Sequence, residues 1–203
     1  MTIEELRRSA ENNGIHLTDE MTKQFETYCA LLQEWNEKMN LTAMKEKDEI
    51  IEKHFHDSLL PLYNKDPKGT VADVGTGAGF PGIVWKIAFP ELNVILIEPT
   101  GKRCTFLKEV IAQLNLKGIE IFNDRAEEHA VKHREEYDIV TARAVAKLSI
   151  LAELCVPLIK KDGVFLAMKG AQGHAEALQA EHAMKVLGCE LEEEKETSLS
   201  EGD

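Results

Sequence analysis

The segment TVADVGTGAGFPG, Thr70 to Gly82, passes from an apolar strand into four glycines and then into a helix-like run at 83–89. Glycine has no Cβ, so a backbone that contains it can turn tightly and approach a ligand closely. The helix that follows offers unpaired N–H groups at its N-terminus. A strand, a glycine turn and a helix in this order are typical of α/β proteins that bind the adenosine half of a cofactor. We therefore expect such a site at residues 75–82.

After this segment the chain alternates short apolar runs with amphipathic stretches. Strands are predicted at 70–74, 93–97, 119–122, 137–141 and 163–168, and helices at 81–89, 101–115, 126–134, 147–159 and 172–187. Strict alternation predicts an α/β fold, a doubly wound and mostly parallel Rossmann-like sheet with helices on both faces.

The residues before the glycine segment predict helices instead. Thr2 and Glu5 fit a capping box, and Thr18 fits the start of a longer helix whose apolar residues recur every three or four positions. A third helical run is predicted at 46–60. We expect an N-terminal helical extension, 1–66, packed on a cofactor-binding domain, 67–203, as one compact unit.

The chain has 203 residues, of which 43% are hydrophobic and 30% charged, as is typical of a soluble globular domain. No signal peptide or membrane-length apolar run is visible, so we expect a cytoplasmic protein. An acidic single domain suggests a monomer. Four widely spaced cysteines predict free thiols. The net charge of −12 is concentrated in 176–203, whereas basic residues recur where strands end: Lys102, Arg103, Arg125, Arg143, Lys147 and Lys169. A local basic face can bind phosphates on an acidic protein.

Asp73, two residues before Gly75, indicates which cofactor binds. A carboxylate there suits the cationic amino acid end of S-adenosylmethionine and would repel a dinucleotide pyrophosphate. The helices before the first strand, and the lack of room for a second domain, also favour a methyltransferase over an oxidoreductase. Glu98 ends the second strand, where a carboxylate can accept hydrogen bonds from the ribose hydroxyls.

The absence of two motifs reduces the number of possible methyl acceptors. The chain lacks the Asn/Asp-Pro-Pro-aromatic run of enzymes that methylate exocyclic amines and the Pro-Cys pair of cytosine-C5 enzymes. Cys155-Val-Pro157 has the wrong order, and we expect Cys155 to be a core thiol. The acceptor should therefore need neither a covalent nucleophile nor a strong base. Guanine N7 meets this condition because its lone pair is free on the Hoogsteen edge.

Seven short motifs in order resemble one family. They are Asn40-Leu-Thr-Ala43, His54-Phe-His-Asp-Ser-Leu59, Asp73-Val-Gly-Thr-Gly-Ala-Gly-Phe-Pro-Gly82, Lys102-Arg-x-x-Phe-Leu107, Arg125-Ala-Glu127, Ala142-Arg-Ala-Val-Ala146 and Met168-Lys-Gly170. From about Leu31 to Gly188 the chain resembles the bacterial 16S ribosomal RNA (guanine-N7) methyltransferase family RsmG, formerly called glucose-inhibited division protein B. The resemblance implies methyl transfer from S-adenosylmethionine to N7 of one guanine in the decoding region of small-subunit 16S ribosomal RNA.

The motifs and the resemblance together assign residues to two sides of a site. The cofactor side comprises Asp73, Gly75, Gly77, Gly79, Phe80, Glu98, Ala126, Glu127 and Arg143, and Glu98 stands where the family commonly has aspartate. The substrate side comprises Asn40, His54, Asp57, Arg125, Arg143 and Lys169 as positioning groups. His54 and Asp57, three residues apart on a helix, can pair; the open alternative is that they only fix this helix to the sheet. No metal site is expected, since His129 and His133 have no third ligand nearby and are predicted on a solvated face. His56 is predicted at the surface or at an interface.

The chain departs from the family at its C-terminus, where a further strand and a basic, proline-containing tail are lacking. In this class the last strand inserts antiparallel beside the fifth, so we expect a C-terminally incomplete sheet and irregular packing at 189–199. Two alternative functions stay open. One is a small-molecule methyltransferase with a closed pocket under the N-terminal helices, and the other is an inactive RNA-binding relic.

Overall fold

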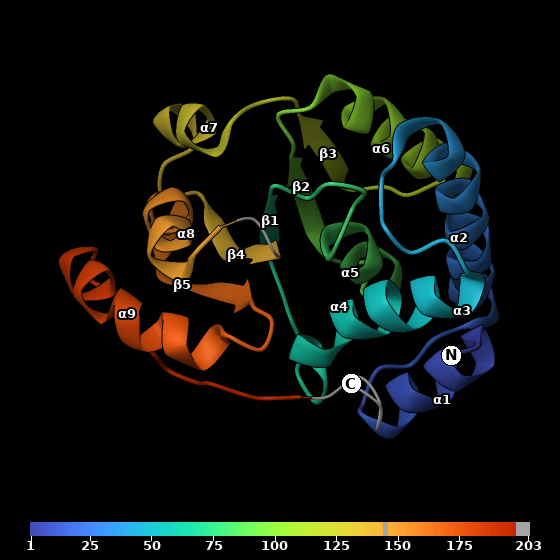
Figure 1. The fold of residues 1–203 in the computed structure, drawn as a ribbon, viewed down its shortest axis with the longest axis horizontal. Helices are drawn as coiled ribbons and strands as arrows, with labels where there is room; N and C mark the ends of the chain where they lie inside the picture. Colours follow the sequence, from blue (N-terminus) through green and yellow to red (C-terminus); the bar gives the residue numbers. More distant parts are fainter. Residues whose placement is uncertain (144–145, 198–203) are drawn as a thin grey trace.

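The computed structural model describes residues 1–143 and 146–197. Five parallel strands form one sheet in the order β3-β2-β1-β4-β5 (Figure 1). The strands are β1 Thr70–Val74, β2 Asn93–Ile97, β3 Ile119–Phe122, β4 Tyr137–Arg143 and β5 Ile159–Met168. The first three begin and end as predicted, whereas β4 continues to Arg143 and β5 begins four residues early, at Ile159 rather than 163.

The strand order reverses beside β1, which pairs with β2 on one side and β4 on the other. In an open parallel sheet, ligands bind at the carboxyl ends of the strands where this reversal occurs. The glycine segment leaves β1 at that point, and Arg143 ends β4 there. The predicted α/β fold is therefore confirmed, and its topology places the two sequence features side by side.

Helices cover both faces of the sheet. After β1 they are α5 Gly82–Ala88, α6 Gly101–Gln113, α7 Ala126–Lys132, α8 Leu148–Cys155 with the 3₁₀ turn Val156–Leu158, and α9 Gly173–Val186. One hydrophobic cluster joins the N-terminal helices, α5 and α6 to one sheet face through Val71, Val94 and Leu96. A second cluster on the other face joins β4 and α8 to Ala72 and Val74. Alternate residues of β1 thus enter different cores, as the period of a strand requires.

The N-terminal helices are α1 Ile3–Asn12, α2 Asp19–Met39, α3 Lys47–Ile50, a π-helical turn η1 Ile51–His56, α4 Asp57–Leu59 and a 3₁₀ turn η2 Leu60–Leu62. The Thr2–Glu5 capping box is confirmed, because Thr2 N–H donates to Glu5 Oε2 (2.7 Å) and Glu5 N–H to Thr2 Oγ1 (3.2 Å). The predicted apolar face of α2 is buried at Phe25, Tyr28 and Leu32. The N-terminal helices therefore form part of the same core as the sheet.

The segment after α9 has no regular secondary structure from Cys189 to residue 197, and within the described residues β5 pairs with β4 alone. The segment crosses from α9 toward η2 (red in Figure 1), where Glu193 Oε2 meets Lys65 Nζ at 2.6 Å. Residues 189–197 are irregular, as expected; residues 198 and 199 lie outside the described range. Among the helices described, none combines the length and apolar character needed to cross a membrane.

Two predictions about histidines are wrong. His129 is fully buried, not solvated: its Nε2 lies 2.7 Å from Tyr137 Oη, its Nδ1 3.3 Å from Asp124 Oδ2, and its ring stacks on His133. His56 is also buried, with Nε2 3.1 Å from Ser9 Oγ. Both ring nitrogens of His129 have polar partners, which offsets the main cost of burying a histidine. In the described residues His56 has a partner at Nε2 alone, and its buried Nδ1 has none.

Candidate active site

Asp73 holds the glycine turn through hydrogen bonds. It is fully buried near the end of β1, and its Oδ2 accepts hydrogen bonds from Thr76 Oγ1 (2.6 Å) and from Gly82 N–H (2.8 Å). The second bond ties the first residue of α5 back to the strand. Burial raises the pKa of Asp73 to about 6, although its two hydrogen bonds act in the opposite direction. The carboxylate therefore stays charged at neutral pH inside the protein.

Glu98 also holds the glycine turn, from the end of β2. Its carboxylate is 1% exposed and joins two backbone segments, since Oε2 accepts from Gly77 N–H (2.9 Å) and Oε1 from Thr100 N–H (2.9 Å). Arg103 approaches the same carboxylate at 3.8 Å. Glu98 thus links the glycine turn to the start of α6, at the end of β2 where the ribose contact was expected.

The glycines of the turn serve two different needs. A Cβ at Gly79 would lie 2.6 Å from Tyr28 Oη, and one at Gly82 would lie 2.8 Å from Asp73 Oδ2, so both positions are closed by packing. A Cβ at Gly77 would meet nothing nearer than 4.0 Å, yet this residue has a φ of +62°, which side chains rarely adopt. Gly77 therefore presents bare backbone toward open space.

These residues fit the charged end of an S-adenosylmethionine molecule. Asp73 Oδ1 is buried and has no hydrogen-bond partner among the described residues, which is a costly condition for a carboxylate oxygen. An ammonium donor at the glycine turn would relieve it. In the described part of the chain no three His, Cys, Asp or Glu side chains are grouped as metal ligands.

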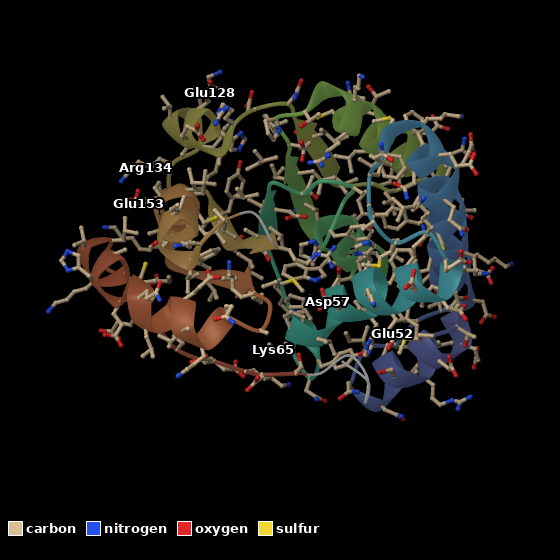
Figure 2. The ribbon with its side chains drawn as sticks, viewed as in Figure 1. Glu52, Asp57, Lys65, Glu128, Arg134 and Glu153 are labelled. Atoms are coloured by element: carbon tan, nitrogen blue, oxygen red, sulfur yellow. The ribbon has the colours of Figure 1, made fainter. Side chains whose placement is uncertain are left out.

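Arg143, at the end of β4, organises a second group of residues. Its Nη1 donates to Asp57 Oδ2 (2.9 Å) and to the Lys53 carbonyl (3.3 Å), and its Nη2 bonds His54 Nδ1 (3.0 Å). The guanidinium also lies over the Phe80 ring, 4.9 Å from its centroid. Figure 2 shows Asp57 near the middle of the molecule. In the described residues, Nε and one Nη2 hydrogen have no partner, so Arg143 keeps donors for a ligand.

The contacts of His54 define its tautomer. A guanidinium only donates, so His54 Nδ1 must accept from Arg143 and its Nε2 carries the hydrogen, donated to Thr42 Oγ1 at 2.6 Å. The ring stacks on Phe80, with centroids 4.5 Å apart. Burial, followed by the Arg143 charge, lowers the pKa of His54 to about 4. His54 and Asp57 thus meet through Arg143 rather than by pairing with each other.

The remaining predicted residues lie apart from this group. Asn40 is exposed at the C-terminal end of α2, with a φ of +49°. Arg125 is 68% exposed and bonds Glu127 at 2.8 Å in front of α7, where Ala126 is partly buried. Lys169 Nζ is held by Glu176 (2.8 Å) and the Ala146 carbonyl (2.6 Å). Since β3 and β5 are the two edges of the sheet, the strands that lead to Arg125 and Lys169 lie roughly 19 Å apart.

Two features of the site were not found from sequence. Residues 51–56 form a π-helical turn, and this irregular stretch brings His54, Asp57 and the Lys53 carbonyl to one guanidinium. No residue pattern signals such a turn in advance, although these turns are frequent at functional sites. Thr42 was also missed, and its place inside the Asn40–Ala43 motif was the available signal.

Sequence comparison gives consistent matches over the whole chain. The family described as rRNA small subunit methyltransferase G matches residues 21–201. A ribosomal RNA small subunit methyltransferase G from Listeria monocytogenes is 45% identical over 98% of this chain and 85% of its own length. The protein of the same name from Halalkalibacterium halodurans is 47% identical over the same shares of the two chains.

Solved structures match the fold at low identity. A ribosomal protein L11 methylase from Lactobacillus delbrueckii subsp. bulgaricus aligns with 72% of this chain and 74% of its own, with a TM-score of 0.54 and 21% identity. A SAM dependent methyltransferase from Aquifex aeolicus aligns with 69% of this chain and 82% of its own, with a TM-score of 0.50 and 18% identity. These matches show the shared architecture of the sheet and its helices.

Proposed function

The chain belongs to the rRNA small subunit methyltransferase G family, and on that premise we propose that it transfers a methyl group from S-adenosylmethionine to N7 of a guanine in 16S ribosomal RNA. The observation that carries the proposal is the adjacency of two groups at the carboxyl ends of β1 and β4. One is the glycine turn with Asp73 and Glu98, and the other is Arg143 with His54 and Asp57.

The cofactor side works through carboxylates on a rigid turn. Bound S-adenosylmethionine supplies an electrophilic methyl group on a sulfonium. Glu98 is proposed to bind the ribose hydroxyls, and Asp73 to supply negative charge near the amino acid end; the position of Glu98 beside the glycine turn and the unpartnered Oδ1 of Asp73 support these roles. Ala126, at the start of α7, is proposed to contact adenine with Glu127.

The acceptor side needs alignment rather than proton transfer. Guanine N7 has a free lone pair, so no base must remove a proton before it attacks the methyl carbon. The unpaired donors of Arg143 are proposed to hold the guanine or the cofactor in line, and His54 and Asp57 fix the guanidinium. Such alignment supplies most of the rate in a transfer of this kind. Cys155 is no nucleophile, since burial raises the pKa of its thiol to about 12.

The basic residues at the two edges of the sheet fit a large anionic substrate better than a small molecule. Arg125 is open to solvent at one edge of the sheet, and Lys169 lies beyond the opposite edge strand. We propose that Arg125, Lys169 and Asn40 meet phosphates and bases around the target guanine. The substrate would be 16S ribosomal RNA, alone or within the small subunit, and the protein a cytoplasmic monomer.

The direct test is methylation of 16S RNA that lacks the modification, presented alone and in small subunits, with mass mapping of the product. We expect one 7-methylguanosine in the decoding region. Methyl on any other atom would reject the acceptor assignment. Calorimetry without RNA tests the cofactor: no binding of S-adenosylmethionine would reject every methyltransferase function and leave the RNA-binding relic.

A further inference from the structure

Tyr28 has a contact that core packing does not explain. It lies on α2, in the N-terminal extension, and its side chain is fully buried between the rings of Phe55 and Phe80. Phenylalanine would fill this place equally well if only packing mattered. The hydroxyl instead donates a hydrogen bond of 2.6 Å to the Ala78 carbonyl, in the middle of the glycine turn.

That carbonyl belongs to a peptide group held at both ends. On the other end of the same peptide plane, Gly79 N–H donates to the Thr76 carbonyl at 2.9 Å. Ala78 is 5% exposed, so water would not easily replace the tyrosine hydroxyl. A Cβ at Gly79 would lie 2.6 Å from Tyr28 Oη, which shows how closely the helix approaches the turn.

We propose that Tyr28 is a positioning residue for the cofactor: its hydroxyl holds the Ala78–Gly79 peptide in the conformation that receives S-adenosylmethionine. The inference rests on the proposed function of the glycine turn. It also gives the N-terminal helices a defined role, because α2 sets the shape of a turn that lies 50 residues further along the chain.

The test is Tyr28→Phe, with Tyr63→Phe as the matched control. Tyr63 is also buried, and its hydroxyl lies 3.0 Å from Ser9 Oγ between α1 and the end of η2, away from the glycine turn. Both variants lose one hydroxyl and one hydrogen bond, so both should lower the midpoint of thermal unfolding. Only Tyr28→Phe should raise the Kd for S-adenosylmethionine, by about tenfold, because it leaves the Ala78 carbonyl unpaired.

Separate effects on cofactor binding and on turnover distinguish a positioning role from a general loss of stability. At saturating S-adenosylmethionine, Tyr28→Phe should regain most of the wild-type kcat, while its KM for the cofactor stays raised. An unchanged Kd in Tyr28→Phe, together with a fall in midpoint equal to that of Tyr63→Phe, would overturn the proposal. Failure of the wild-type protein to bind S-adenosylmethionine would instead reject the proposed function itself.

A second measurement, fluorine NMR of labelled tyrosines, tests the proposal without a substitution at Tyr28. The chain has three tyrosines, so fluorotyrosine labelling gives three fluorine signals that Tyr63→Phe and Tyr137→Phe assign. Saturation with S-adenosylmethionine should shift the Tyr28 signal and leave the Tyr63 signal in place. A Tyr28 signal that does not move would also overturn the proposal.

Discussion

The two sides of the candidate site hold their charges in different ways. On the cofactor side, Asp73 and Glu98 are almost fully buried. They accept hydrogen bonds from the Thr76 hydroxyl and from three backbone N–H groups, all within 21 residues of the carboxylate that they bind. On the substrate side, Arg143 is held by Asp57 and His54, which precede it by 86 and 89 residues. One side is built by a single strand–turn–helix unit and its neighbour, and the other by elements that meet only in the folded protein.

Rigidity and adaptability lie on different sides of the site. The buried carboxylates hold the turn through hydrogen bonds within the protein. Arg143, in contrast, has donors with no partner among the residues that the structure describes, and Arg125 is open to solvent. A site that must accept an invariant small cofactor and a large folded RNA gains from this division, since preorganisation reduces the cost of binding the first.

Arg143→Ala tests the substrate side most strongly. The variant loses the cation that joins β4 to α4 through Asp57 and lies over Phe80 of the turn, so we expect methyl transfer to fall about a thousandfold. The fold should survive, because Asp57 is partly exposed and can be hydrated. Rates of methyl transfer and thermal unfolding measure the two effects. Arg134→Ala, at an exposed arginine labelled in Figure 2, is the control, and near-normal turnover in Arg143→Ala would remove Arg143 from the mechanism.

Asp73→Asn tests the burial of charge on the cofactor side. The folded protein raises the pKa of Asp73 from its ordinary 3.8 to about 6, so the native state holds this proton more tightly than the unfolded state. The free energy of unfolding should therefore fall as pH rises from about 4 to about 6, by up to roughly 3 kcal/mol in the wild type relative to Asp73→Asn. Denaturant unfolding at a series of pH values measures it.

Asp162→Asn, at an exposed aspartate, provides the matched control for that series, because it removes one carboxylate outside the site. If the free energies of unfolding of wild type and Asp73→Asn depend on pH in the same way, Asp73 titrates near its ordinary pKa. Water would then reach this carboxylate more easily than its burial indicates.

His54→Asn examines the bridge between the two sides. The neutral ring accepts from Arg143 and donates to Thr42, and asparagine can make only one of these contacts, so kcat/KM should fall about tenfold. Because the pKa of His54 is lowered to about 4, the ring stays neutral as pH falls from 7.5 to 5.5. The pH–rate profiles of wild type and His54→Asn should therefore run parallel. A wild-type decline centred near 6.5 that the variant lacks would show a histidine that titrates normally.

The same contrast explains what the sequence could predict. The glycine turn and the positions of Asp73 and Glu98 near the ends of β1 and β2 follow local rules of spacing and turn chemistry, and β1, β2 and β3 lie where they were expected. The partners of Arg143 follow no local rule. They lie on or beside a π-helical turn, and that turn depends on contacts between residues far apart in the chain. His129 was placed wrongly for a related reason: its buried partner Tyr137 lies in the next strand, which an i, i+4 pattern on α7 does not reveal.

Arg125→Gln should give the smallest effect. Arg125 is exposed and already pairs with Glu127, so the variant should leave the midpoint of unfolding and the Kd for S-adenosylmethionine unchanged. Loss of one phosphate contact should weaken RNA binding about threefold and reduce the slope of log affinity against log salt by nearly one. Salt titrations of RNA binding measure both, with Arg134→Gln as the control. An unchanged slope would confine RNA recognition to the Arg143 side of the sheet, whereas a raised Kd for the cofactor would show that the loop before α7 belongs to the rigid side of the site.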